Sequence, residues 1–82
     1  MKYCCYIIYS AKIDHYYIGH TENIDQRLTQ HNSGVSSFTS KADDWIIVYR
    51  QEFETRKDAR NREMEIKKKK SRKYIEWISS VG

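Results

Sequence analysis

A tyrosine-rich stretch, Tyr16–Gly19, is followed along the sequence by an arginine and a histidine that could act together. Arg27 and His31 are four residues apart, so a helix would hold the guanidinium and the imidazole side by side. This pair would suit a phosphate group. An ordinary pair at the margin of the core, with packed methylenes and solvated polar tips, is the alternative. The spacing alone leaves both interpretations open.

A glutamate further along the chain lies in an apolar setting. Ala59, Glu63 and Ile66 fall at i, i+4 and i+7, so they share one face of a helix whose other positions are mostly charged. A carboxylate within a short apolar stripe costs several kcal/mol unless it is paired or bound to a metal. The pattern therefore predicts that Glu63 is either in a salt bridge or a ligand, whereas Glu65 points elsewhere.

Three runs of strand-forming residues must position these groups. Lys2–Ser10 has no polar side, so we expect a strand that is central or covered on both faces. A short connection leads to a second strand, His15–Gly19, and the two should form an antiparallel hairpin. Gly19 permits a positive φ or a close approach of another group, or it only ends the strand. The third strand is expected at Trp45–Gln51, and its core Trp45–Tyr49 is continuously apolar, which again predicts a strand covered on both faces.

Three helices are expected between and after the strands. Thr21 can cap the first, which runs to about Asn32, while Thr55 and Ser71 can cap the second and third. The segment Ser33–Asp44 is small and polar and reads as a loop. Its hydroxyls and one amine could touch a phosphate; the candidates are Ser36, Ser37, Thr39, Ser40 and Lys41.

Length and cysteine usage limit the class of protein. With 82 residues there is room for one domain, 1–82, with a thin core. Cys4 and Cys5 are adjacent, so in a strand they point to opposite faces and are expected to be buried thiols. The histidines show no spacing with them that suits zinc. Because no apolar run approaches the length that spans a bilayer, we expect a soluble, cytoplasmic protein without membrane contact.

Positive charge is concentrated near the end of the chain. Arg56–Lys73 holds ten lysines and arginines against three acidic residues, a net +7, whereas the whole chain carries +4. Such a concentration favours a surface that neutralises nucleic-acid phosphates, although a solvated helix face is the alternative. The candidate nucleic-acid-binding residues are Arg56, Arg60, Lys67, Lys68, Lys70, Arg72 and Lys73.

This set of residues resembles the GIY-YIG endonuclease family, and the likeness covers nearly the whole chain. The second signature of the family is present as Tyr17-Ile18-Gly19, and the helix motif as Asn23, Arg27, Leu28 and His31; Glu63 matches the acidic residue of the later helix. Of the first signature only Tyr6 is present, preceded by Cys4 and Cys5. His20 stands where many members carry a lysine or a tyrosine.

The resemblance implies an α+β fold in the order β-β-α-β-α-α, with a three-stranded antiparallel sheet flanked by three helices. It implies an endonuclease, similar to the incision domain of excision-repair enzymes and so connected with DNA repair. Catalytic roles then fall to Tyr6, Tyr17, Arg27, His31 and Glu63, which we expect in one surface cleft beside the sheet.

In this mechanism the two tyrosines share the base and orienting roles, and histidine takes or relays the proton. Arg27 clamps the phosphate, and Glu63 holds one Mg²⁺ or Mn²⁺. The partner is DNA, contacted mainly through its phosphates by a monomer or weak dimer. Two alternatives stay open, namely an inactive nucleic-acid-binding module and a basic protein-interaction domain.

Overall fold

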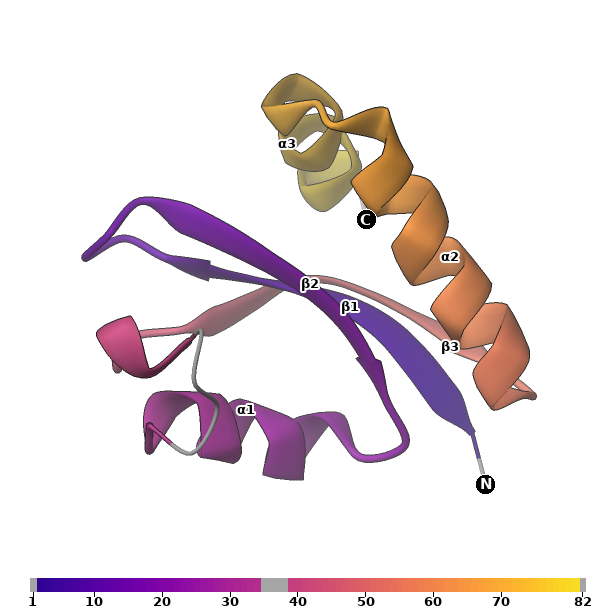
Figure 1. Cartoon of the computed structure of the whole chain (residues 1–82), viewed down its shortest axis with the longest axis horizontal. Coiled ribbons are helices and arrows are strands. Elements are labelled where there is room, and N and C mark those ends of the chain that lie inside the picture. Colours follow the sequence, from indigo (N-terminus) through magenta and orange to yellow (C-terminus); the bar gives the residue numbers. More distant parts are fainter. Residues whose placement is uncertain (1, 35–38, 82) are drawn as a thin grey trace.

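The computed structural model describes residues 2–34 and 39–81, so Ser36 and Ser37 of the predicted loop lie outside it. Its elements are β1 (Tyr3–Ser10), β2 (His15–Thr21), α1 (Ile24–Asn32), a 3₁₀ turn η1 (Thr39–Lys41), β3 (Ile46–Phe53), α2 (Arg56–Lys69) and α3 (Arg72–Val81). One antiparallel sheet, ordered β2-β1-β3, has α1 on one face and α2 and α3 on the other (Figure 1). The predicted α+β class and element order are confirmed.

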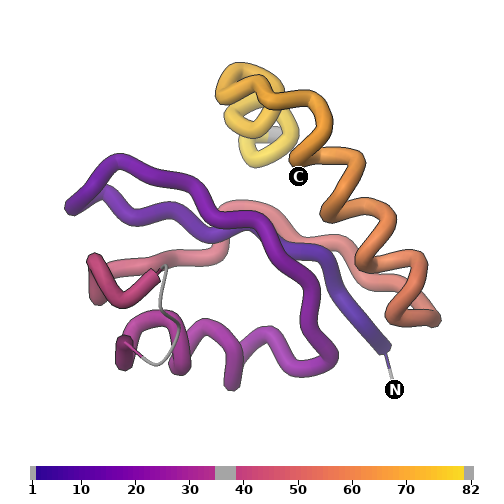
Figure 2. The backbone as a smooth tube through the Cα atoms, viewed as in Figure 1, coloured from indigo at the N-terminus to yellow at the C-terminus, as the bar shows by residue number. Residues whose placement is uncertain are grey.

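The backbone trace in Figure 2 shows the chain passing from β2 to α1 on one face and, after β3, to α2 and α3 on the other. Each face of the sheet therefore has its own cluster of buried side chains. Among the described helices, none combines the length and apolar character needed to cross a membrane.

The central strand β1 contributes to both clusters. Cys4, Tyr6 and Ile8 pack toward α1, while Cys5 and Ile7 pack toward α2 and α3. The prediction of a strand covered on both faces is confirmed, as is the prediction of buried, unpaired thiols. Burial raises the pKa of Cys5 to about 12, so its thiol stays protonated at neutral pH.

Strand β3 lies at the edge of the sheet, and it also contributes side chains to both clusters. Ile7 pairs with Tyr49 but Ile8 pairs with Ile47, so Val48 is an extra residue at a β-bulge. The bulge places Val48 and Tyr49 in the same cluster, and Ile47 in the other. The continuous apolar run therefore serves both faces, as predicted, although Ile46 at its start is 58% exposed.

Trp45 precedes β3 instead of beginning it, contrary to the predicted strand Trp45–Gln51. Its side chain is 2% exposed, and its indole N–H donates to the carbonyl oxygen of Thr39 at 2.9 Å. The side chain of Asn32, at the end of α1, accepts from the Trp45 N–H at 2.8 Å and donates to the Trp45 carbonyl at 3.1 Å. These contacts attach the end of α1 to the entry of β3.

The helix caps agree with the sequence in two cases of three. Thr55 caps α2 by accepting from the N–H of Asp58 at 3.1 Å, and the Ser71 hydroxyl accepts from the N–H of Tyr74 at the start of α3. For α1 the prediction is wrong: Thr21 still belongs to β2, and Asn23 is the cap. The strand continues two residues past Gly19, so the cap lies two residues further along the chain, at Asn23.

Gly19 lies inside β2 opposite Tyr6 of β1. A Cβ atom at position 19 would lie 2.7 Å from the Tyr6 hydroxyl oxygen and 2.9 Å from its Cζ atom. Since real Cβ atoms do not approach other atoms so closely, Gly19 is required here by a close approach and not as a strand terminator.

We predict that Gly19→Ala destabilises the fold by about 1–3 kcal/mol, because the Tyr6 ring is buried and cannot move aside without strain. Urea unfolding followed by circular dichroism would measure the change. Gly34→Ala is the comparison: its new Cβ would lie 4.0 Å from the nearest atom, so only the positive φ of 82° adds a cost, about 1 kcal/mol. An unchanged midpoint for Gly19→Ala would contradict the close packing.

Candidate active site

Two tyrosines lie next to each other on the face of the sheet that α1 covers. Tyr6 and Tyr17 are diagonal neighbours across β1 and β2, with ring centroids 6.5 Å apart. Because Gly19 has no side chain, the Tyr6 ring lies over it and its hydroxyl points toward the β2 edge. Tyr6 is 1% exposed, whereas Tyr17 is partly exposed.

His31 extends from α1 into this tyrosine pair and is completely buried. Its Nε2 atom lies 2.9 Å from the Tyr6 hydroxyl, and its Nδ1 atom lies 2.6 Å from Oγ1 of Thr39 in η1. The Tyr17 ring is 4.9 Å from the imidazole centroid. Burial, and secondarily the charge of Arg27, lowers the pKa of His31 to about 4, so the ring is neutral at physiological pH.

Arg27, one turn earlier on α1, completes this group. Its Nη1 atom donates to Oε1 of Gln30 at 3.0 Å. Burial raises the pKa of Tyr6 well above its usual value, and a hydrogen bond from Arg27 opposes that rise. A guanidinium only donates, so the Tyr6 oxygen accepts from it and can pass its own O–H to Nε2 of His31. Nδ1–H then donates to Thr39.

Glu63 approaches from α2, on the other face of the sheet. Its Oε1 atom lies 2.6 Å from Nδ1 of His20, and its Oε2 atom lies 2.6 Å from Nζ of Lys67. The carboxylate is only 15% exposed, compared with 60% for Glu65. Burial alone would raise the pKa of Glu63, but the hydrogen bonds from His20 and Lys67 outweigh it and hold that pKa below its usual value. Glu63 is therefore a paired, ionised group, one of its two predicted states.

The five predicted catalytic residues thus come from two layers that meet at β2. Tyr6, Tyr17, Arg27 and His31 lie on the α1 face, and Glu63 lies on the α2 face. A cavity of about 270 Å³ adjoins β2, and of the five only Tyr17 lines it. One cleft shared by all five stays a prediction.

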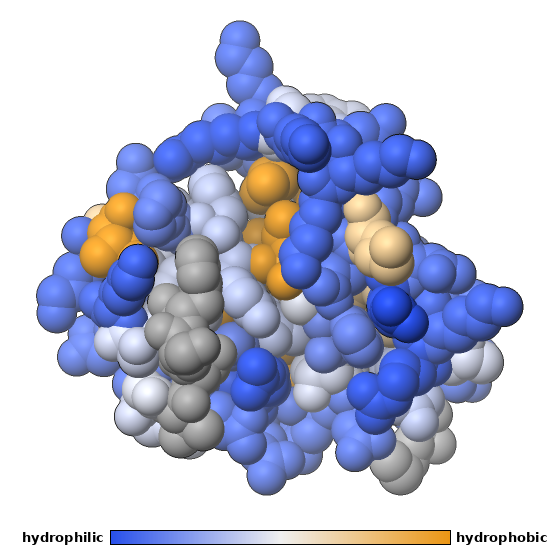
Figure 3. Space-filling view, in the orientation of Figure 1, coloured by the Kyte–Doolittle hydropathy of each residue, from blue (hydrophilic) through white to orange (hydrophobic). Residues whose placement is uncertain are grey.

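The predicted nucleic-acid-binding residues are all exposed and lie on or between α2 and α3. Some of them have carboxylate partners: Arg56 lies 3.7 Å from Glu22, and Arg72 pairs with Asp14 at 2.5 Å. Hydrophilic side chains dominate this part of the surface in Figure 3. The helices therefore present a largely cationic layer that adjoins Glu63.

Two of these contacts were not predicted from the sequence. Thr39, predicted as a loop hydroxyl that could touch a phosphate, is buried and bonds His31 instead. His20 bonds Glu63 because the alternation of side chains along β2 places it on the α2 face, opposite to Tyr17. In the described part of the chain, no cluster of three or more histidine, cysteine or acidic residues forms a ready metal site.

Comparison with known proteins adds to this geometry. The sequence model of the protein family described as the GIY-YIG catalytic domain matches residues 2–75 of the chain. A UPF0213 protein of Staphylococcus haemolyticus is 33% identical over 67 residues, covering 80% of each protein. A UPF0213 protein of Staphylococcus saprophyticus is 32% identical over 79 residues, covering 95% of each.

A solved structure is also similar. The solution NMR structure of the UPF0213 protein BH0048 from Bacillus halodurans aligns with a TM-score of 0.59 and 27% identity, covering 99% of this chain and 85% of that one. The family model, the relatives and the fold agree with one another. The chain belongs to the GIY-YIG family, whose catalytic domain supports a nuclease-type function.

Proposed function

We propose that this protein is a metal-dependent endonuclease that hydrolyses phosphodiester bonds of DNA. The observation that supports it most is the chain of hydrogen bonds from Arg27 through Tyr6 and His31 to Thr39, with Tyr17 packed against the imidazole. A neutral imidazole beside two tyrosines and a guanidinium can accept a proton and face a negative charge at the same time.

Arg27 acts as the phosphate clamp. A guanidinium has five N–H donors, and its contacts with Gln30 and Tyr6 leave others for phosphate oxygens. Because the side chain is partly exposed, a phosphate at the β2 edge can reach it. The same charge stabilises the extra negative charge that develops as water attacks the phosphorus.

The two tyrosines have different surroundings, and we assign them different roles. Tyr17 is partly exposed at a cavity and its ring packs against His31, so its hydroxyl is placed to orient the attacking water. Tyr6 is buried with a raised pKa, so it keeps its proton and positions His31 and Arg27.

Glu63 would hold the divalent cation. Lys67 now covers Oε2, but its side chain is half exposed, so a divalent ion could displace it and would itself keep the carboxylate ionised. Mg²⁺ and Mn²⁺ need few protein carboxylates beside water and phosphate oxygens, so this residue fits. The ion would stabilise negative charge on the leaving 3′ oxygen.

A second candidate function is that of a nucleic-acid-binding module without catalysis. One observation favours it: both oxygens of Glu63 already have hydrogen-bond partners, His20 and Lys67. Incubation with supercoiled plasmid and with branched DNA, each with and without Mg²⁺ or Mn²⁺, separates the two functions. Divalent-dependent nicking supports the nuclease, whereas salt-sensitive binding without nicking supports the module.

We predict that Glu63→Gln lowers divalent-dependent cleavage by about 100-fold or more while the protein stays folded, because the amide is a poor metal ligand of nearly the same shape. Plasmid nicking and circular dichroism measure the two effects. Glu65→Gln is the matched control on the same helix, exposed and paired with Arg62, and should cleave nearly as well as the native protein. Wild-type cleavage by Glu63→Gln would exclude the carboxylate as the metal ligand.

We predict that Tyr17→Phe lowers kcat by about 100-fold or more with little change in stability, because its hydroxyl acts on water at a partly exposed site. Tyr6→Phe should also destabilise the fold by about 1–3 kcal/mol, since it leaves the buried Nε2 atom of His31 without its hydrogen-bond partner. Single-turnover cleavage and urea unfolding of both variants distinguish these roles. Equal losses of stability would contradict the assignment.

The buried imidazole predicts a specific pH dependence of stability. Folding lowers the pKa of His31 from 6.5 to about 4, so its contribution is complete above pH 6.5 and is lost progressively as the pH falls toward 4. The loss amounts to about 3 kcal/mol. Urea unfolding between pH 4 and 7 should therefore show a weaker pH dependence for His31→Gln than for the native protein. His15 lies at an exposed position, so His15→Gln should leave the pH dependence of stability unchanged. An equal weakening of that dependence in both variants would exclude His31 as its source.

A further inference from the structure

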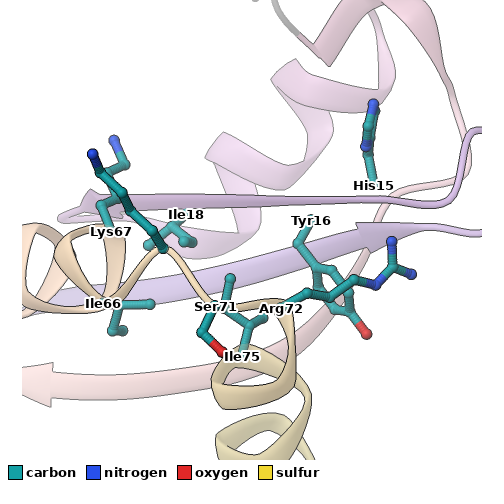
Figure 4. A pocket seen from close by; sticks show the side chains of 9 residues that line it. His15, Tyr16, Ile18, Ile66, Lys67, Ser71, Arg72 and Ile75 are labelled. Carbon is teal, nitrogen blue, oxygen red and sulfur yellow. The ribbon is translucent and has the colours of Figure 1, made fainter.

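A cavity of about 310 Å³ lies between β2 and the junction of α2 with α3. Its walls are apolar where Ile18, Ile66 and Ile75 face one another, with the edge of Tyr16 beside them (Figure 4). Figure 3 shows hydrophobic side chains among hydrophilic ones in the middle of the face where Figure 1 places β2 beside these helices. The volume is at the lower end of small-ligand pockets, which suits a single ring system.

Three cationic residues line the same cavity. Lys67 and Arg72 lie toward opposite ends of the view in Figure 4, and Lys70 lies between them in the sequence. Arg72 is bound to Asp14 and Glu76, and it covers one face of the Tyr16 ring at 5.3 Å. Lys70 ends α2 in the left-handed conformation, φ 50°, and within the described residues it has no carboxylate partner.

The cavity adjoins the groups assigned to catalysis. Lys67 lines it and also lines the neighbouring cavity at Tyr17, and its ammonium group bonds Glu63 at 2.6 Å. A ligand with an apolar ring and an anionic group would thus bury the ring against isoleucines and bring the anion to Lys70 and Lys67. It would lie one side chain away from Glu63.

We propose that this cavity holds one unpaired nucleotide of a DNA strand, next to the phosphate that is cut. The inference rests on the proposed function and names its substrate class: DNA with an unpaired nucleotide at a flap, bulge or single-stranded end. A base inside a duplex must first lose its pairing and stacking to enter a cavity, whereas an unpaired base enters at little cost. The apolar walls accept any base, so the preference is for structure and not for sequence.

The first test uses the unmodified protein without divalent ions. Thymidine 5′-monophosphate, inorganic phosphate and thymidine are titrated separately while amide chemical shifts are followed by NMR. The nucleotide should shift the amides of Ile18, Lys70 and Ile75, whereas inorganic phosphate should leave Ile18 and Ile75 in place. Nucleotide-induced shifts spread over the α2 lysines, with Ile18 and Ile75 unmoved, would overturn the proposal.

The second test compares two lysines of the same segment. Lys70→Asn removes a charge from the cavity, and asparagine tolerates the left-handed backbone better than most residues. Lys68→Asn removes the same charge outside the cavity lining. Fluorescence anisotropy in EDTA measures binding to a 12-nucleotide single strand and to a blunt duplex.

Lys70→Asn should weaken single-strand binding about fivefold more than duplex binding, whereas Lys68→Asn should weaken both by the same factor. Equal ratios for the two variants would overturn the proposal. Since neither test involves cleavage, a protein that binds in this way but never nicks DNA would refute the nuclease proposal and leave the cavity assignment standing. A protein that nicks DNA but lacks these binding effects would refute the cavity assignment and leave the nuclease proposal standing.

Discussion

The close approach of Tyr6 to Gly19 is the constraint on which the site depends. The ring can cross β2 only because no side chain stands there, and from that position its hydroxyl meets His31 and its oxygen accepts from Arg27. The other imidazole nitrogen is satisfied by Thr39. A buried polar chain with a partner at every link is rigid, whereas one missing partner would leave a costly unpaired group. This chain therefore holds α1 and η1 in place as well as organising the chemistry.

The edge strand β2 connects the two faces of the sheet. Successive strand residues point to opposite faces, so Tyr17 faces α1 while its neighbour Ile18 and, further on, His20 face α2. The aromatic and cationic groups on one side and the paired carboxylate on the other are consequently separated by a single strand. An edge strand also has no further strand beyond it, which leaves room for a nucleic-acid backbone beside it. The Tyr17-Ile18-Gly19 motif thus lies at the edge where the α1 face and the α2 face of the sheet are both accessible from outside.

Electrostatics explains why an acidic residue can exist within a strongly basic segment. Hydrogen bonds from His20 and Lys67 hold the pKa of Glu63 below its usual value, so the carboxylate stays ionised. Because Lys67 is half exposed, its contact with Glu63 is the more readily exchanged of the two. Under the proposed function, an incoming phosphate would compete with Glu63 for this ammonium group, which would link DNA binding to release of the carboxylate. Lys67 also lines the apolar cavity, so a group bound in that cavity would act on the same contact between Lys67 and Glu63.

The sequence by itself determined the features that depend on local periodicity. Alternation along β1 placed Cys4 and Cys5 on opposite faces, and the helical stripe around Glu63 required a partner for its charge. What depended on pairing between distant segments could not be read in this way. The bulge at Val48 exists only in the register with β1. It distributes the side chains of a continuous apolar run over both faces of the sheet. The burial of His31 was likewise decided by η1, because a boundary position on a helix becomes interior only when another segment covers it. Local propensity acts on neighbours in the chain, whereas burial, pKa and the identity of each charge partner are properties of the packed molecule.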